Sequence, residues 1–375
     1  MSDRAPEKLT IQILKDDIDI APCLASGPIA GAAIEAVLAA QNIGDAPWST
    51  FAKVCATPYL FNGMERSFDS DREPVGEINQ LLENLASFFK IIAKTGFSDL
   101  VAPSNSQSGL ADEISGHIED VTGEHYGRLF ENFSPGSYFE EPARLLKLRL
   151  ERNGIEIEDL SRKKVLDAGC GNGRYTTAWK LIGADQAVGA DISPLNIETA
   201  RRRVEQSNIN GIAFEQANAL ELPFPDNSFD IVFSNGVLHH TVDWRAGVAE
   251  LIRTLKKGGL GWLYLIEKPG GLFWDVIEIL RVITRGLDRN LARNALRSLG
   301  IPANRIFYML DHVMVPINIR LSPDEIIDAL EDAGANEIRR LNRGADFDRI
   351  ERIHRGAAFA EIKYGAGENR FIFSK

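Results

Sequence analysis

The sequence has few of the features that mark secreted, metal-binding or membrane-spanning proteins. Its 375 residues include only three cysteines, Cys23, Cys55 and Cys170, whose spacing fits neither a disulfide framework nor a zinc site. The N-terminus lacks the basic start and apolar core of a secretory signal. The most apolar long run, residues 21–40, is interrupted by two prolines and a glutamate, so it does not suit a bilayer span. These absences predict a cytoplasmic protein with free thiols and no metal site.

Positive charge is scarce in the first third of the chain. The net charge is −11, and residues 1–130 hold 19 acidic and 9 basic side chains. Nucleic-acid binding depends on clustered cations, so this balance argues against nucleic acid as a substrate. The 44% of apolar and 25% of charged residues describe an ordinary globular protein.

The most informative segment is a glycine-rich turn between an apolar run and a helix-like run. Glycine is needed where φ is positive or where a ligand lies against the main chain. A helix that opens behind such a turn presents N–H groups and its positive dipole end to the ligand. A second acid, Asp191, ends another apolar run and is typical of a site that holds both ribose hydroxyls. The turn has the pattern D-x-G-x-G-x-G, formed by Asp167, Gly169, Cys170, Gly171 and Gly173.

The spacing favours a nucleoside over a dinucleotide. A dinucleotide site needs a third glycine in G-x-G-x-x-G, but Arg174 and Thr176 occupy the neighbouring positions. The carboxylate of Asp167 suits a ligand that carries an ammonium group and would repel a pyrophosphate. The pattern therefore indicates S-adenosylmethionine (SAM) as the cofactor.

The following segments carry a family resemblance. Residues 211–224 resemble a third strand with an adenine-side loop, and the pattern "LPF…D.SFD.V…LHH" spans residues 222–240. A helical run over 244–255 and a strand over 260–266 follow. The chain resembles the class I SAM-dependent methyltransferases, and most closely the type 11 branch that contains ubiquinone and menaquinone biosynthesis enzymes. The resemblance covers residues 160–267 closely and 322–375 loosely.

The resemblance implies an α/β fold with a Rossmann-like, seven-stranded, mainly parallel sheet flanked by helices. We predict a helical accessory unit over residues 1–110, a candidate for homodimer contacts, with helices over 31–41 and 75–94. The methyltransferase domain is predicted over 111–375. Residues 268–320 form an insertion after its fifth strand.

The same resemblance implies roles around the cofactor. Asp167 and the glycine turn, with Cys170 inside it, hold the methionine part, and Asn235 lies beneath it. Asp191 takes the ribose hydroxyls. Where the family usually has Asp-Ala, this chain has Asn218-Ala219, and the amide oxygen can still accept a hydrogen bond from adenine. The remaining cofactor-binding residues are Ile192 on the adenine ring and, in an aromatic lid, Tyr126 and Tyr138, for which core packing is the alternative.

The acceptor side is less sharply marked. The end of the fourth strand comes closest to the transferred methyl in this fold, so His239 and His240 are candidates for general base or acceptor orientation. One of the two is expected to be structural. Residues 343–349, with Asp311 and His312, form either an acceptor pocket or a surface loop held by ion pairs.

A run of arginines at four-residue spacing occupies the insertion. On one helix these side chains would form a basic stripe that meets an anionic substrate, a membrane surface or the acidic N-terminal unit. The alternative is a solvated face whose arginine stems cover apolar neighbours. The run consists of Arg281, Arg285, Arg289, Arg293 and Arg297.

The predicted function is SAM-dependent methylation of a small molecule at oxygen or carbon. Two alternatives remain, a non-catalytic SAM-binding assembly protein and a methyltransferase that acts on protein or RNA. An Asn-Pro-Pro-Tyr-type motif for amino groups is absent, because residues 234–237 are Ser-Asn-Gly-Val.

Overall fold

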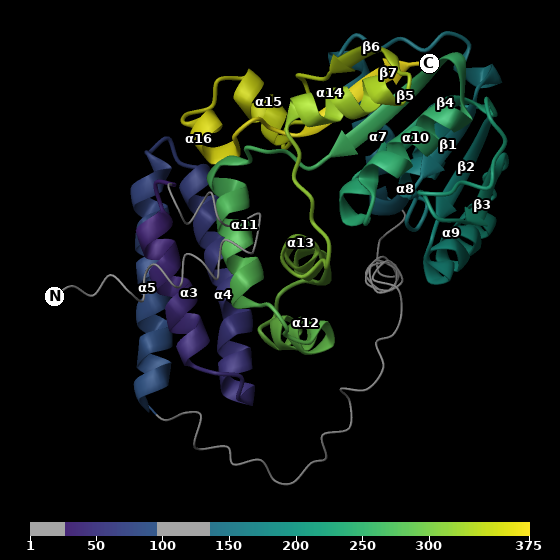
Figure 1. The fold of residues 1–375 in the computed structure, drawn as a ribbon. Coiled ribbons are helices and arrows are strands. Elements are labelled where there is room, and N and C mark those ends of the chain that lie inside the picture. The colour runs from purple at the N-terminus through teal and green to yellow at the C-terminus, as the bar shows by residue number, and fades with distance from the viewer. Residues whose placement is uncertain (1–26, 96–135) are drawn as a thin grey trace. The chain divides into compact units, whose positions relative to one another are not determined.

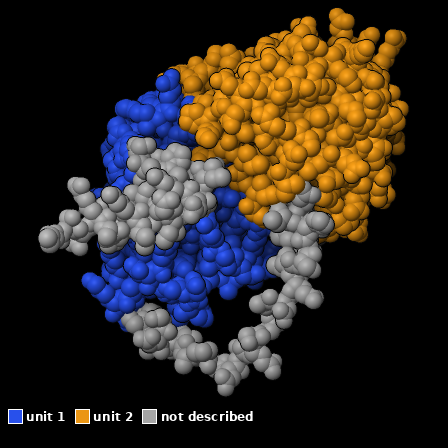
Figure 2. All heavy atoms as spheres, in the orientation of Figure 1, with its two compact units in different colours: residues 1–113, 270–315, 357–365 blue, residues 114–269, 316–356, 366–375 orange. Residues whose placement is uncertain are grey.

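The computed structural model describes residues 27–95 and 136–375. The chain divides into two compact units, drawn in different colours in Figure 2. Of the described residues, unit 1 holds 27–95, 270–315 and 357–365, and unit 2 holds 136–269, 316–356 and 366–375. The predicted boundary between residues 110 and 111 lies outside the described residues.

Unit 2 contains a seven-stranded sheet in the order β3-β2-β1-β4-β5-β7-β6 (Figure 1). The first five strands along the chain pair in parallel, and β7 runs antiparallel to both β5 and β6. This confirms the predicted mainly parallel sheet. The strands are β1 (Lys164–Ala168), β2 (Gln186–Asp191), β3 (Ile212–Gln216), β4 (Phe229–Asn235), β5 (Leu255–Leu265), β6 (Asn336–Arg340) and β7 (Asn369–Ser374).

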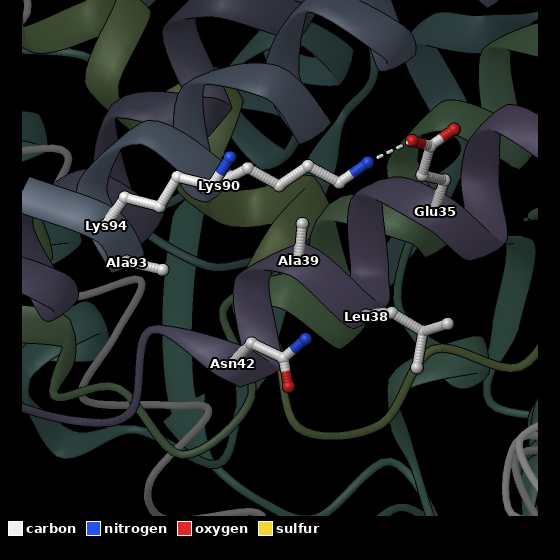
Figure 3. Close-up of a pocket in the computed structure, with 7 residues that line it drawn as sticks. All are labelled: Glu35, Leu38, Ala39, Asn42, Lys90, Ala93 and Lys94. Carbon is white, nitrogen blue, oxygen red and sulfur yellow. Dashed lines mark hydrogen bonds and ion pairs between the residues drawn. The ribbon is translucent and has the colours of Figure 1, made fainter. Parts of the chain in front are cut away.

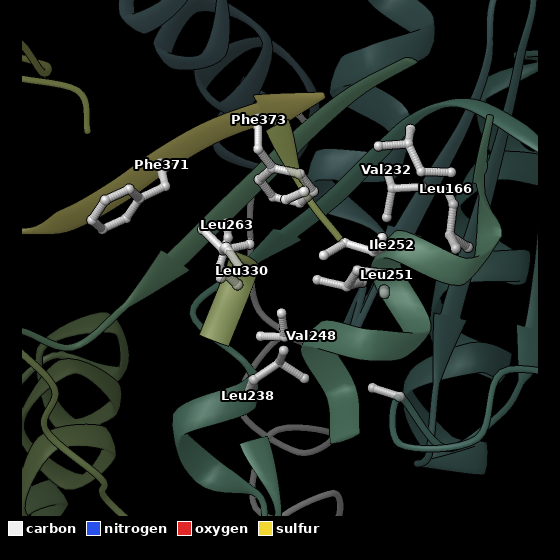
Figure 4. Close-up of a cluster of buried hydrophobic side chains, with 14 of the residues drawn as sticks. Leu166, Val232, Leu238, Val248, Leu251, Ile252, Leu263, Leu330, Phe371 and Phe373 are labelled. Atoms are coloured by element: carbon white, nitrogen blue, oxygen red, sulfur yellow. The ribbon is translucent and has the colours of Figure 1, made fainter. Parts of the chain in front are cut away.

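The apolar runs that predicted strands are buried on both faces of the sheet. On one face, Leu166, Val232 and Leu263 pack against helices α10 (Trp244–Thr254) and α14 (Pro323–Asp332), as Figure 4 shows. On the other face, Val165 and Phe233 belong to a second apolar cluster with Trp179. Parallel strands covered on both faces read as continuous apolar runs, which is why they were visible in the sequence.

The remaining helices of unit 2 flank the sheet (Figure 1). Helix α14 begins with a complete capping box, in which Ser322 Oγ accepts from the N–H of Glu325 and the Glu325 carboxylate accepts from the N–H of Ser322. These other helices are α7 (Glu141–Arg152), α8 (Arg174–Leu181), α9 (Pro194–Ser207) and α15 (Arg349–His354).

The described part of unit 1 is helical. The helices predicted over 31–41 and 75–94 are confirmed as α3 (Ala30–Asn42) and α5 (Pro74–Thr95). A third, α4 (Pro47–Phe68), was not predicted, and it contains Pro58 in its interior. No helix in the described ranges is both long and apolar enough to cross a membrane. The other helices of this unit are α11 (Gly271–Ile283), α12 (Arg289–Ser298), α13 (Ala303–Val313) and α16 (Ala360–Tyr364).

The division into units differs from the predicted domain boundaries. The sequence placed all of 111–375 in one domain, whereas the structure groups 270–315 and 357–365 with the N-terminal helices. Packing explains the difference, because α11 is apolar around most of its surface and packs on α3 and α4, and α12 and α13 also pack on α4. The predicted insertion thus completes the core of unit 1.

The arginine run does not form a stripe on one helix. Helix α11 ends at Ile283, Gly286 has a φ of 76°, and α12 begins only at Arg289. Arg281 donates to the carbonyl oxygen of Val315 at 2.9 Å, and Arg289 donates to that of Met314. These two guanidinium groups therefore hold the chain after α13, which the four-residue spacing alone did not indicate.

Candidate functional site

The glycine turn between β1 and α8 has the backbone that the sequence predicted. Gly169, Gly171 and Gly173 have φ values of 79°, 53° and 84°, a region that favours glycine. A Cβ on Gly169 would lie 2.3 Å from a methyl carbon of Val237, and one on Gly173 would lie 2.6 Å from the Phe214 ring. The turn therefore excludes larger residues through both its conformation and its close neighbours.

Main-chain bonds tie this turn to the end of β2. The N–H groups of Gly169 and Cys170 both donate to the carbonyl oxygen of Ala190, at 2.7 and 2.9 Å. The N–H of Gly171 donates to Asp191 Oδ2 at 2.8 Å. The two strand ends that carry the predicted cofactor residues are thus held side by side.

The Asp191 carboxylate is almost fully enclosed by donors. Its second oxygen, Oδ1, accepts from the N–H of Ser193 and from the side-chain amide of Asn196, each at 3.0 Å. Burial raises the pKa of Asp191 above its ordinary value, although these donors oppose the shift. Sequence reasoning missed Ser193 and Asn196. The pair Ser193-Pro194, a cap followed by proline at the first helical position, is the signal that could have placed them.

Asp167 lies at the base of the turn with its carboxylate buried. Its Oδ2 accepts from the hydroxyl of Thr176 at 2.6 Å, a partner that sequence reasoning also missed. Burial raises the pKa of Asp167 to about 7, and the nearby charge of Asp191 adds to the rise. The carboxyl is therefore poised between its neutral and charged forms near neutral pH.

Tyr138 contacts the turn from the segment before α7. Its hydroxyl donates to the carbonyl oxygen of Asn172, and the guanidinium of Arg203 lies 4.6 Å from the centre of its ring. The side chain is fully buried, so Tyr138 supports the turn from the interior of the unit. The amide nitrogen of Asn172 is buried without a hydrogen-bond partner among the described residues. Tyr126 lies outside the described residues.

The adenine-side residues occupy the loops after β2 and β3. The carbonyl oxygen of Ile192 accepts from the side chain of Gln216 at 3.2 Å. Asn218 Oδ1 accepts from the N–H of Leu220 at 2.9 Å. One of the two lone pairs of this oxygen is therefore used in a hydrogen bond within the loop. Ala219 belongs to the apolar core. The Cys170 side chain is also buried, in a cluster with Ile197 and Phe214. Cys170 therefore contributes its backbone, and not its thiol, to the surface of the turn.

The end of β4 carries the two candidate catalytic histidines. Asn235 Oδ1 accepts from the indole nitrogen of Trp262 at 3.3 Å. The rings of His239 and His240 are 4.1 Å apart, centre to centre. His239 is 2% exposed, and its carbonyl oxygen accepts from the N–H of Ile319. His240 is half-buried, and its Nδ1 lies 2.7 Å from the carbonyl oxygen of Ile317.

The His240 contact assigns its tautomer. A carbonyl oxygen can only accept, so Nδ1 must carry a hydrogen, and the lone pair of the neutral ring resides on Nε2. A lone pair on an imidazole nitrogen is what a general base requires. Of the two rings, that of His239 is the more deeply buried, and that of His240 keeps the larger exposed fraction.

The loop over residues 343–349 is held by ion pairs, as one of the two predictions stated. Arg149 Nε lies 2.8 Å from Asp348 Oδ2, and both side chains are about 95% buried. Arg152 pairs with Asp346, and Arg343 pairs with Glu351. Asp311 and His312 belong to α13 of unit 1.

A hollow of about 400 Å³ lies between α3 and α5 in unit 1. Figure 3 shows that polar and charged side chains line it together with apolar ones, and that Lys90 and Glu35 form an ion pair there. No group of three or more metal-ligating side chains occurs in the described ranges.

The residues at this edge fit SAM. The left-handed turn gives close access to the main chain, and two buried acids stand at the ends of β1 and β2. The unpartnered amide nitrogen of Asn172 suits a carboxylate oxygen of the cofactor's methionine part.

Comparison with known proteins supports the same conclusion. Residues 166–263 match the family model described as a methyltransferase domain. The 27-O-demethylrifamycin SV methyltransferase of Amycolatopsis mediterranei is 34% identical over 128 residues, which cover 33% of this chain and 47% of that protein. The chloroplastic tocopherol O-methyltransferase of Arabidopsis thaliana is 32% identical over 168 residues, covering 41% and 47%. A demethylmenaquinone methyltransferase of Listeria monocytogenes is 34% identical over 141 residues, covering 35% and 58%.

The chain spans about half the length of these curated relatives. The sheet order, the glycine turn and the family match define the class: unit 2 contains a class I SAM-dependent methyltransferase domain. The matched family model is that of the type 11 branch, and the match supports SAM as the cofactor of this domain.

Proposed function

We propose that this protein transfers the methyl group of SAM to an oxygen or carbon atom of a small-molecule acceptor. One relationship carries the proposal: the cofactor turn is held at the end of β2, while an imidazole with its lone pair on Nε2 stands at the end of β4. The relatives named for rifamycin, tocopherol and menaquinone substrates support the class of acceptor.

The chain's own residues bind and orient the cofactor and accept one proton from the acceptor. Bound SAM supplies a methyl carbon that is already activated for displacement. The turn and Asp191 fix the cofactor in one orientation, which lowers the entropic part of the barrier. His240 Nε2 accepts the proton that an acceptor hydroxyl or acidic carbon must lose. Asp167 provides a carboxylate that can ionise beside the ammonium group of the cofactor.

We also propose a cytoplasmic location and a homodimer formed through unit 1. The small number of cysteines supports the first, and the two in the described residues, Cys55 and Cys170, are free thiols. The exposed apolar side chains Phe88 and Ile91 on α5 support the second. Sedimentation of the full chain measures the dimer, and Ile91→Glu should lower its mass to that of one chain.

The decisive experiment uses methyl-labelled SAM and fractionated cell extract. Small-molecule, protein and RNA fractions are incubated separately with the full chain, and label is measured in each. The proposal expects label in a small-molecule fraction and its loss in Asp191→Asn. Label confined to protein or RNA would overturn the acceptor class. Absence of label from every fraction, with SAM bound, would favour the non-catalytic alternative.

A further inference from the structure

Tyr264 stands at the ligand-binding edge of the sheet, next to the candidate base. It lies opposite Asn235 in the parallel register of β4 and β5, close to the carboxyl end of β5. The chain leaves β4 at Asn235 and reaches the histidine pair four residues later. The half-buried Tyr264 therefore shares one edge with the residues proposed to meet the acceptor.

The aromatic ring of Tyr264 is fixed by its neighbours. The ring of His239 lies 6.0 Å away, centre to centre, at an angle of 69°. The guanidinium of Arg370 lies 4.8 Å from the ring centre, within the range of cation–π attraction. Gly236, with a φ of 84°, also approaches the ring, since a Cβ there would lie 3.6 Å from it. The direction of the hydroxyl is thus determined by packing.

The hydroxyl makes no hydrogen bond to a residue that the structure describes, and it is not among the fully buried polar atoms that lack a partner. It therefore reaches a surface that a ligand can contact. The other two tyrosines near the turn differ, because Tyr138 donates to a carbonyl oxygen and Tyr175 accepts from Arg149. A ring that packing holds in place, with a polar end that makes no bond to the protein and is not sealed off, is the arrangement expected of a ligand contact.

The surroundings of Tyr264 favour its protonated form. Burial, and next the charge of Glu267, raise the pKa of Tyr264 above its ordinary value. The hydroxyl therefore keeps its hydrogen across the physiological range and acts as a donor. This separates its role from that of His240, whose lone pair accepts a proton.

We propose that Tyr264 donates a hydrogen bond to an oxygen atom of the methyl acceptor and so orients the atom that is methylated. The acceptor is then a small molecule with a carbonyl, hydroxyl or carboxylate oxygen close to its methylation position. This inference rests on the proposed methyltransferase function and adds a residue and a requirement on the acceptor's chemistry.

The test compares Tyr264→Phe with the wild-type protein on the extract fraction that takes up label from SAM. Phenylalanine keeps the packing against His239 and Arg370 and removes only the hydroxyl. Loss of one hydrogen bond should lower kcat/KM for that fraction about tenfold. The affinity for S-adenosylhomocysteine and the thermal midpoint should stay unchanged. Tyr59→Phe in α4 removes another hydroxyl without a described partner and should behave as the wild type.

The pH profile separates donation from base catalysis. A donor that stays protonated leaves the shape of the pH–rate profile unchanged in Tyr264→Phe, whereas a lost base would abolish its acidic limb. Unchanged kcat/KM in Tyr264→Phe, with label still transferred, overturns this inference and leaves the proposed function intact. If the wild-type protein labels no small-molecule fraction, both the proposed function and the inference on Tyr264 are overturned.

Discussion

Asp191 and Gly171 are joined by a hydrogen bond of 2.8 Å that ties the end of β2 to the turn after β1. The same carboxylate that the sequence assigned to ribose therefore also shapes the glycine turn. One acid can serve both ends of the site because a carboxylate has about four acceptor positions and three are used by protein donors. Its removal should affect the whole cofactor site.

Asp191→Asn should weaken binding of S-adenosylhomocysteine by about 2 to 4 kcal/mol, because charge-assisted bonds to the turn and to the ribose are lost together. Calorimetric titration measures the effect, and the exposed acid Asp185→Asn is the matched control. A 2′-deoxyribose analogue isolates the sugar contact. Wild type should bind the analogue more weakly than the parent compound, and Asp191→Asn should bind the two equally. Equal binding by the wild type would remove the ribose role.

Binding of S-adenosylhomocysteine should strengthen between pH 6 and pH 8. The free protein holds Asp167 with a pKa of about 7, above the unfolded value, so the carboxyl is mostly neutral at pH 6. The ligand's ammonium group favours the charged form, so binding at pH 6 must release a proton and is weaker by up to about tenfold. Asp167→Asn should bind with little pH dependence over this range. An equally steep dependence in the variant would assign the titration to another group.

The same pKa shift makes the stability of the folded apo-protein fall as pH rises, whereas cofactor binding strengthens. Because the folded-state pKa of Asp167 is raised, the folded apo-protein binds this proton more tightly than the unfolded chain. Its contribution to stability is therefore full below about pH 4, declines as pH rises to about 7, and is lost above that. Asp167→Asn should flatten this part of the stability profile of the apo-protein, measured by urea unfolding at several pH values.

His240→Gln should lower turnover of the labelled acceptor by about 100-fold or more while S-adenosylhomocysteine affinity changes little. The physical reason is that the Nε2 lone pair takes the acceptor's proton and does not hold the cofactor. Single-turnover rates and calorimetry measure the two quantities separately. His354→Gln, an exposed histidine on α15, is the control and should keep wild-type turnover. If His240→Gln also keeps wild-type turnover, His240 is not the base that takes the acceptor's proton.

Gly169→Ala should destabilise the protein and abolish cofactor binding, because its Cβ would meet Val237 at 2.3 Å and its φ is 79°. Gly154→Ala separates the two causes, since Gly154 has a φ of 61° and open space around it. We expect the control to lose only about 1 kcal/mol of unfolding free energy and to keep its cofactor affinity. The double variant Gly169→Ala with Val237→Ala should recover part of the lost stability. No recovery would show that φ alone sets the cost.

The parts of this fold that the sequence revealed are those written in local patterns. The strands around Asp167 and Asp191 read as apolar runs because both faces of the sheet are covered, and Ser322 marks the start of α14 through its own side chain. The glycine turn was visible because its backbone excludes side chains.

Other features depend on partners far apart in the sequence. Nothing near α11 indicates that it completes the core of unit 1, because its apolar surface is equally consistent with packing on the sheet. The position of the Tyr264 hydroxyl becomes evident only once its neighbours His239 and Arg370 are in place. The arginine run failed as a stripe because Gly286 separates two helices.

Asp348→Asn should destabilise the protein by about 3 to 5 kcal/mol at pH 7, because it leaves Arg149 and Arg370 buried beside an uncharged amide. Burial opposes ionisation of Asp348, but Arg370 and Arg149 hold its pKa below the ordinary range. A lowered folded-state pKa gives stability that is full above about pH 4 and is lost as pH falls further. The difference between wild type and variant in urea midpoint should therefore shrink below pH 4. Asp346→Asn, in an exposed pair with Arg152, should cost about 1 kcal/mol or less, and an equal loss in both variants would contradict the role of burial.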